Sequence, residues 1–207
     1  MKVEEPHPRR GVVPPRPRED VCAGTEGNAR LTGTTGAVLI LLLAAEGATI
    51  LRIRDLISVH IFLGMLLIPP VALKLATTGY RFVSYYAGVA AYRANGPPHA
   101  LMRYLVAPVL VASTVVLFGT GVALMVRGPD GGLLLGLHQA SFIAWLGATS
   151  VHVVWYLMPL PALVSADWRR AQRIGRGALR IGLVGAVLLA GVALAASTLP
   201  LAHMWAE

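Results

Sequence analysis

Long apolar stretches decide the fold, and the clearest of them reads LLLGLHQASFIAWLGATSVHVVWYLMPL from Leu133 to Leu160. Four further stretches of the same character cover residues about 35–51, 56–78, 104–126 and 181–199. A helix of roughly 20 residues crosses the ~30 Å hydrocarbon core of a bilayer. The stretches are continuously apolar rather than alternating, and they are too long for barrel strands of ~10 residues. We therefore predict an all-α membrane protein with about five transmembrane helices.

The composition excludes an ordinary soluble domain. Of the 207 residues, 56% are hydrophobic and 14% are charged, and the mean hydropathy is +0.65; soluble domains carry more charge and less apolar surface. The net charge of +8 is explained by cations that flank membrane spans and face anionic lipid. Membrane lipid is therefore an expected partner, and no nucleic acid is needed to account for the charge.

The two ends of the chain differ from the apolar middle. Residues 1–33 hold five prolines, mixed charges and no apolar period, which predicts a disordered cytoplasmic arm. The arm is too long and too mixed in charge for the n-region of a signal peptide. We expect a transmembrane helical domain over residues 34–200 and a short outer tail over residues 201–207. The single cysteine, Cys22, lies in the arm and has no second cysteine to pair with.

The arginines and lysines predict how the chain is oriented in the cell (plasma) membrane. Fourteen of these cations lie in segments on one side of the predicted spans and three lie on the other. Cytoplasmic loops carry the excess of Lys and Arg in multi-pass proteins. We therefore expect the N-terminus in the cytoplasm and the C-terminus outside. The three outer cations are Arg52, Arg54 and Arg127.

Ionisable side chains inside the spans are the first candidates for function, because burying them in lipid is costly. They are Glu46, His60, Lys74, His138 and His152. His138 and His152 are fourteen residues apart, so on one helix they point within about 40° of the same direction and lie ~21 Å apart along the axis. His60 and His138 lie near the outer ends of two spans that run the same way. Two neutral imidazoles at matching depth can supply both axial ligands of one haem iron.

A second site is suggested near the inner surface. Lys74 follows His60 by fourteen residues and lies at the depth of His152. Its side chain could ligate iron as the neutral amine, which burial favours. Alternatively, the Lys74 side chain holds a haem propionate or snorkels to the cytoplasmic surface with its charge in water. These two alternatives are favoured over ligation of iron.

Glycines lie close to the histidines in sequence. Gly64 comes one turn after His60, Gly147 lies between the two histidines of the fourth span, and Gly119 and Gly121 lie in the third. A flat macrocycle passes a helix closely where no side chain projects. Small residues also let bare helices pack closely in membranes, so the glycines alone do not separate the two explanations.

The first two spans contain two further features from which we predict structure: a pair of prolines and a glutamate. Pro69 and Pro70 remove backbone donors in the middle of the second span and are expected to kink it. Glu46, near the outer end of the first span, is expected to pair with Arg52 or Arg54. The alternative role for this carboxyl group is proton uptake coupled to electron transfer.

These residues resemble the membrane-embedded b-type cytochromes, in particular the bacterial cytochrome b561-like group and the haem-bearing membrane subunits of quinone-linked or molybdenum oxidoreductases. The resemblance covers about residues 34–200 and rests on the helix count, on the pair His138 and His152, and on the motif His60-Ile61-Phe62-Leu63-Gly64. It implies a four-helix haem-binding-type bundle plus one peripheral helix. It also implies iron ligation by His60 and His138 for one haem b, and by His152 for a second haem.

The resemblance further implies an electron-transfer function rather than a stand-alone enzyme. Electrons would pass through one or two haems between a quinol pool or redox partner subunit and an acceptor. Lys74 stands where a two-haem pattern would place a fourth histidine. The stretch from Pro69 to Lys74, with Gly79-Tyr80-Arg81-Phe82, is also similar to actinobacterial integral membrane proteins whose activity is not established.

Two other functions fit parts of the sequence. The first is a haem-free membrane anchor or interaction protein of an oxidoreductase or other complex, because a lone membrane histidine more often forms an interhelical hydrogen bond than a metal bond. The second is a proton-coupled transporter, in which Glu46, Lys74 and a broken second helix would supply a path. No inverted repeat supports the transporter, and no flavin or nicotinamide motif is present.

Overall fold

A computed structural model of the chain describes residues 19–94, 96, 99–128, 132–157, 176–202 and 205. This part of the chain is helical, with no strand, and five of its helices are long and apolar enough to cross a membrane. The predicted all-α class with five transmembrane helices is therefore confirmed, and the chain is a multi-pass membrane protein. The long elements are α1 (Glu19–Ile50), α2 (Ile53–Tyr86), α4 (Ala107–Arg127), α5 (Gly132–Leu157) and α7 (Arg176–Ala202).

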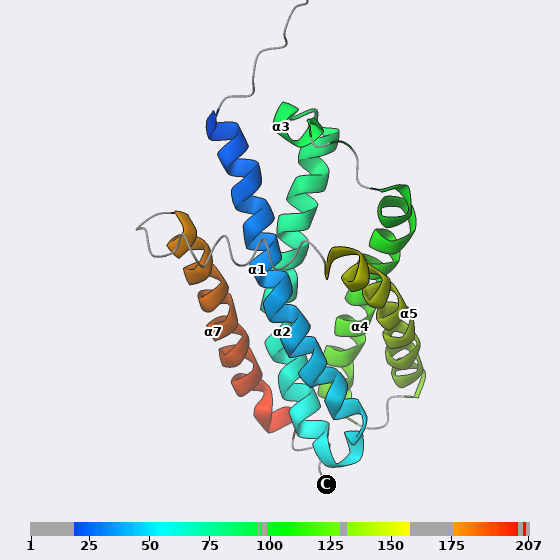
Figure 1. The fold of residues 1–207 in the computed structure, drawn as a ribbon. Helices are drawn as coiled ribbons and strands as arrows, with labels where there is room; N and C mark the ends of the chain where they lie inside the picture. Colours follow the sequence, from blue (N-terminus) through cyan, green and yellow to red (C-terminus); the bar gives the residue numbers. More distant parts are fainter. Residues whose placement is uncertain are drawn as a thin grey trace, which may run out of the picture.

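Two short elements connect the long helices at one end of the bundle. The four-residue helix α3 (Ala90–Arg93) follows α2 and packs against α1 and α2. A π-helical turn, η1 (Met102–Val106), leads directly into α4. The α1–α2 and α4–α5 connections lie at the opposite end, here called the hairpin end (Figure 1).

Helix α2 is the centre of the arrangement. It packs most extensively against α7 on one side and α1 on another, and it also contacts α4. Helix α5 packs against α4 and η1 and lies at the far side of the molecule from α7 (Figure 1). The core between α2 and its neighbours contains Met65, Leu66, Met125 and Ala195.

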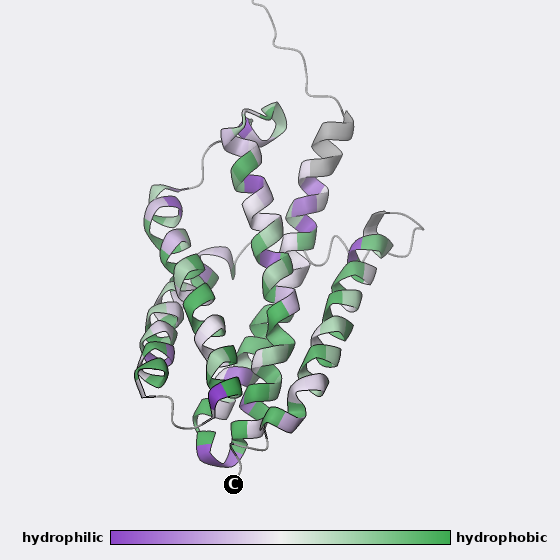
Figure 2. Cartoon of the chain, turned by 180° about the vertical axis from the view of Figure 1, so that it is seen from behind, coloured by the Kyte–Doolittle hydropathy of each residue, from purple (hydrophilic) through white to green (hydrophobic). Residues whose placement is uncertain are grey.

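The exposed surface is what a membrane environment requires. Hydrophobic residues predominate along the long helices, and hydrophilic residues are more frequent toward their ends (Figure 2). Leu133, Val154 and Leu189 are 81%, 72% and 72% exposed. Side chains of this kind on the outside of a helical bundle find their favourable surroundings in lipid.

The boundary predicted between arm and first helix is wrong. Helix α1 begins at Glu19, so residues 19–33 are helical rather than disordered. Contacts with α2 explain the extension: the side chain of Asn28 donates to the backbone oxygen of Thr77 at 3.1 Å, and Arg30 and Thr32 are buried. Residues 1–18, including most of the predicted arm, lie outside the described residues.

The kink expected at Pro69 and Pro70 is not where the backbone departs from helical geometry. Within α2, only Leu56 has non-helical dihedral angles, with φ −116° and ψ 17°. Pro70 is fully buried in the helix. The helix also continues past Thr78 to Tyr86, so the aromatic segment after the predicted second span belongs to the same helix.

The remaining span boundaries agree closely with the apolar stretches. The third span is formed by η1 and α4, from Met102 to Arg127, and the fourth by α5. The last part of the predicted fourth span, residues 158–160, lies outside the described residues. Helix α7 extends to Ala202, so the predicted outer tail begins inside a helix.

Candidate functional site

His60 lies near the hairpin end of α2 and faces the end of α1. Only a two-residue turn separates the two helices, so their neighbouring turns are side by side. The ring atom Nδ1 of His60 is 3.0 Å from Oε1 of Glu46 and 2.9 Å from Oγ1 of Thr49. The side chains of His60 and Glu46 are only 21% and 15% exposed. The fold therefore holds this imidazole in one orientation.

The hydrogen bonds of Thr49 favour one tautomer of His60. Its hydroxyl donates to the backbone oxygen of Glu46 at 2.6 Å, and a hydroxyl has only one hydrogen to give. A hydrogen on the ring atom Nδ1 satisfies both Thr49 and an ionised Glu46 carboxylate at once. A neutral imidazole has one N–H, which leaves the lone pair on Nε2 of His60.

His138 lies on α5, and α4 anchors its ring in a similar way. Its Nδ1 is 3.1 Å from the backbone oxygen of Leu117 and 3.1 Å from Oγ1 of Thr120. The carbonyl oxygen can only accept, and Thr120 already donates to the backbone oxygen of Val116 at 2.7 Å. Nδ1 of His138 is therefore the donor, and in the neutral ring the lone pair again lies on Nε2.

Gly121 explains how the His138 ring lies so close to α4. A Cβ atom at this position would be 3.2 Å from Cε1 of the ring, which is closer than such atoms normally approach. The absence of a side chain at Gly121 therefore leaves room for the histidine itself. Gly119, two residues earlier, faces open space.

The two imidazoles lie toward the same end of the bundle on different helices, α2 and α5. Both lie near the hairpin end of their helices, which run in the same direction through the bundle (Figure 1), and His138 acts electrostatically on His60. Neither Nε2 atom forms a hydrogen bond within the part of the chain that the structure describes. The arrangement offers two lone-pair nitrogens from different helices, the donor set that a six-coordinate haem iron requires.

The partner of Glu46 differs from the one expected. Glu46 contacts His60, whereas Arg52 donates to Asp55 at 2.7 and 3.1 Å. The expected pairing of Glu46 with Arg52 or Arg54 is therefore wrong: Arg52 pairs with Asp55 in the first turn of α2, and Arg54 forms no ion pair with Glu46. The second carboxyl oxygen of Glu46, Oε2, is buried and has no hydrogen-bond partner among the described residues.

The inner pair of candidates is arranged differently. Nζ of Lys74 donates to the backbone oxygen of Thr32 on α1 at 2.7 Å, and a Cβ on Gly36 would be only 3.0 Å from it. The amine thus lies against the backbone of α1. Ligation of iron by Lys74 stays a prediction that none of these contacts supports.

His152 shares one face of α5 with His138. Both belong to the less exposed stripe of this helix, which also contains Ser141 and Trp145, as the fourteen-residue spacing predicted. The ring of His152 packs on Tyr156 with 4.9 Å between ring centroids, and Lys74 acts electrostatically on it.

The remaining predicted glycines do not contact a histidine. A Cβ on Gly64 would meet Oε1 of Glu46 at an ordinary 3.6 Å, and one on Gly147 would meet nothing within 4 Å. Sequence reasoning missed the two anchoring hydroxyls, Thr49 and Thr120. Their only sequence signal is a threonine near the hairpin-facing end of the helix that precedes each histidine-bearing helix.

Within the described ranges, no group of three or more His, Cys, Asp or Glu side chains is placed to hold a bare metal ion. No protein family, curated protein or solved structure matches this chain. The resemblance to b-type cytochromes therefore stays a prediction. The functional argument depends on the anchored histidines, and their geometry is the basis of the proposal that follows.

Proposed function

We propose that this protein is a membrane-embedded b-type cytochrome whose haem b is held by His60 and His138. One observation carries the proposal: two histidines on different helices each present an unengaged Nε2 while Nδ1–H is anchored. Metal-ligating histidines typically donate the other ring N–H to a carboxylate or backbone carbonyl. Glu46 supplies the carboxylate for His60, and Leu117 supplies the carbonyl for His138.

The residues around the two rings have separable tasks under this proposal. Glu46 and Thr49 orient His60, and Thr120 with the carbonyl of Leu117 orients His138. A haem bound here supplies reversible one-electron chemistry, and the protein sets its potential through ligands, hydrogen bonds and burial. The electrons would come from a quinol pool or a redox partner and leave to an acceptor, which makes the chain an electron-transfer subunit.

The inner candidates support one haem better than two. Lys74 is already hydrogen-bonded to α1, so a second haem would have only His152 as a protein ligand from this pair. We therefore propose a stoichiometry of one haem per chain. The N-terminus would face the cytoplasm of a cell whose plasma membrane holds the protein, following the excess of cations on that side.

A haem-free anchor or interaction protein is the second candidate. The observation that favours it is that both histidines already bridge two helices through their Nδ1 atoms. Interhelical hydrogen bonds of this kind stabilise membrane bundles without a cofactor. The two candidates differ in what the Nε2 atoms do, and haem content separates them.

The test is quantitative haem extraction from the purified full-length chain, expressed with ample haem. We expect about one haem b per chain, reduced strongly in His60→Ala and in His138→Ala. His99→Ala is the matched control, because His99 lies outside the spans and packs on Trp155 at 5.0 Å. Adding imidazole to His138→Gly should restore haem if ligation is the role. Folded, colourless wild-type protein would favour the anchor.

A further inference from the structure

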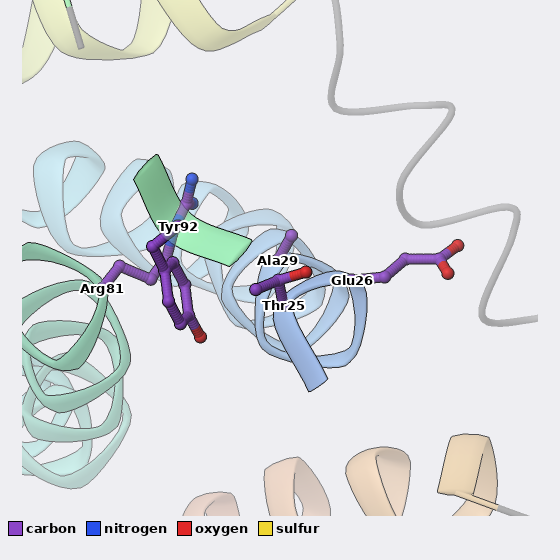
Figure 3. A pocket seen from close by; sticks show the side chains of 5 residues that line it. All are labelled: Thr25, Glu26, Ala29, Arg81 and Tyr92. Carbon is purple, nitrogen blue, oxygen red and sulfur yellow. The ribbon is translucent and has the colours of Figure 1, made fainter. Parts of the chain in front are cut away.

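A second feature lies at the other end of the bundle, away from the hairpin end. A cavity of about 270 Å³ opens between α1, α2 and α3. It is lined by Thr25, Glu26, Ala29, Arg81 and Tyr92. Arg81 and Tyr92 lie next to each other on one side, and the α1 residues lie on the other (Figure 3).

The charge in this cavity is positive and uncompensated. Arg81 forms no hydrogen bond or ion pair within the described part of the chain, and it acts electrostatically on Lys74, a second cation. The one acidic residue of the lining, Glu26, is paired with Arg30. Its carboxylate points away from Arg81 and Tyr92 (Figure 3). An anion in the cavity would meet a free guanidinium rather than a facing carboxylate.

Tyr92 supplies a hydrogen-bond donor beside Arg81. Burial raises the pKa of Tyr92 above its ordinary value, and Tyr80 adds to this effect, while Arg81 and a hydrogen bond with Asn28 oppose it. The side chain of Thr25 lies on the opposite side of the cavity, where it forms part of the wall (Figure 3). A guanidinium with a neighbouring phenol donor is the chemistry that recognises a phosphate group.

The position of the cavity indicates where such a phosphate comes from. It lies beside the extension of α2, where Tyr80, Phe82, Tyr85 and Tyr86 form the aromatic surface typical of a membrane–water interface. Arginines surround the same end of the bundle, whereas the hairpin end has few. The described arginines at this end are Arg30, Arg81, Arg93, Arg103 and Arg180. Basic pockets between membrane helices at this depth bind the headgroups of anionic lipids.

We propose that this cavity binds the phosphate group of an anionic phospholipid headgroup, with Arg81 as the charged ligand and Tyr92 as a hydrogen-bond donor. Thr25 and Ala29 form the wall that faces them. The site is independent of the histidines, so it stands whether or not the protein binds haem.

The test is native mass spectrometry of the full chain titrated with phosphatidylglycerol, with phosphatidylcholine as the neutral-headgroup comparison. We expect Arg81→Gln to weaken the tightest phosphatidylglycerol binding about five-fold, the loss of one cation near the surface, and Tyr92→Phe to weaken it about three-fold. Arg54→Gln is the matched control, because Arg54 is an exposed arginine at the hairpin end of the same helix. It should bind as the wild type does.

Three outcomes overturn the proposal. Equal binding by Arg81→Gln and the wild type would remove the assigned ligand. Equal losses in Arg81→Gln and Arg54→Gln would show attraction to overall charge rather than to a site. Displacement of the lipid by inorganic phosphate at millimolar concentration, with no preference for phosphatidylglycerol over phosphatidylcholine, would assign the cavity to a soluble anion.

Discussion

Replacing Gly191 by alanine should separate the two helices that pack most extensively in this fold. Gly191 lies on α7 where it meets α2, and a Cβ atom there would be 2.4 Å from the backbone oxygen of Leu66. Close carbon–oxygen contacts in proteins are ~3.3 Å, so the helices must move apart by about 0.9 Å. The obstacle is backbone rather than a flexible side chain, and no rotamer change relieves it.

The energetic effect follows from that displacement. A gap of 0.5–1 Å forfeits roughly a quarter to a half of each dispersion contact along the interface, and overpacked cores lose about 1–3 kcal/mol. Gly185→Ala is the matched control on the same helix, because a Cβ at Gly185 meets nothing within 4 Å. Both substitutions gain the same helix propensity of up to ~1 kcal/mol, which cancels when the two variants are compared.

The assay is unfolding of the purified chain in mixed micelles by titration with sodium dodecyl sulfate. We expect the free energy of unfolding of Gly191→Ala to be about 1–3 kcal/mol below that of Gly185→Ala. Equal unfolding free energies for the two variants would refute the close approach of α7 to α2 at this position.

Three further predictions concern the candidate site. Gly121→Ala should displace the histidine ring beside it and lower haem content at least several-fold, whereas Gly119→Ala, which faces open space, should leave haem content unchanged. Glu46→Ala removes an acceptor of the Nδ1–H of His60 and should weaken haem retention about 10–100-fold. Thr49→Ser keeps the hydroxyl that contacts the same ring atom, so this variant should behave as the wild type in haem titrations. Lys74→Met should lower stability by about 1–3 kcal/mol through the lost hydrogen bond to α1 without changing the haem-to-protein ratio, and a ratio that falls would instead identify the lysine as a ligand.

The fold was predictable where burial in lipid alone determines structure. The apolar stretch that begins at Leu133 forms α5, and the predicted third span forms η1 and α4, because every backbone group inside a bilayer must be satisfied within its own helix. The start of α1 was not predictable from hydropathy. Residues 19–33 are polar, and they are helical because Asn28 and its neighbours bind α2, a tertiary contact that a local pattern does not contain.

The backbone of α2 shows a second limit of local reasoning. Proline in a helix interior removes a hydrogen bond and usually bends the helix. Here the surrounding bundle buries Pro70 completely, and the non-helical residue is Leu56, next to the tight connection from α1. The geometry of that turn, rather than residue propensity, determines where the helix departs from regularity.

The candidate site was also predictable only in part. His60 and His138 could be selected from the sequence because ionisable groups in membrane spans are rare and their depth follows from helix geometry. The anchoring groups could not be selected. Thr49, Thr120 and the carbonyl of Leu117 are ordinary in composition, and only the packing of α1 on α2 and of α4 on α5 brings them to the rings.

The most direct test of the central claim is the reduced-minus-oxidised optical spectrum of the purified full-length protein, expressed with ample haem. The account predicts narrow low-spin b-type bands, because two imidazole nitrogens would complete the coordination of the iron. The bands should be lost in either His60→Ala or His138→Ala and kept in His152→Ala. A folded protein without these bands, or bands that survive both of the first two substitutions, would contradict it.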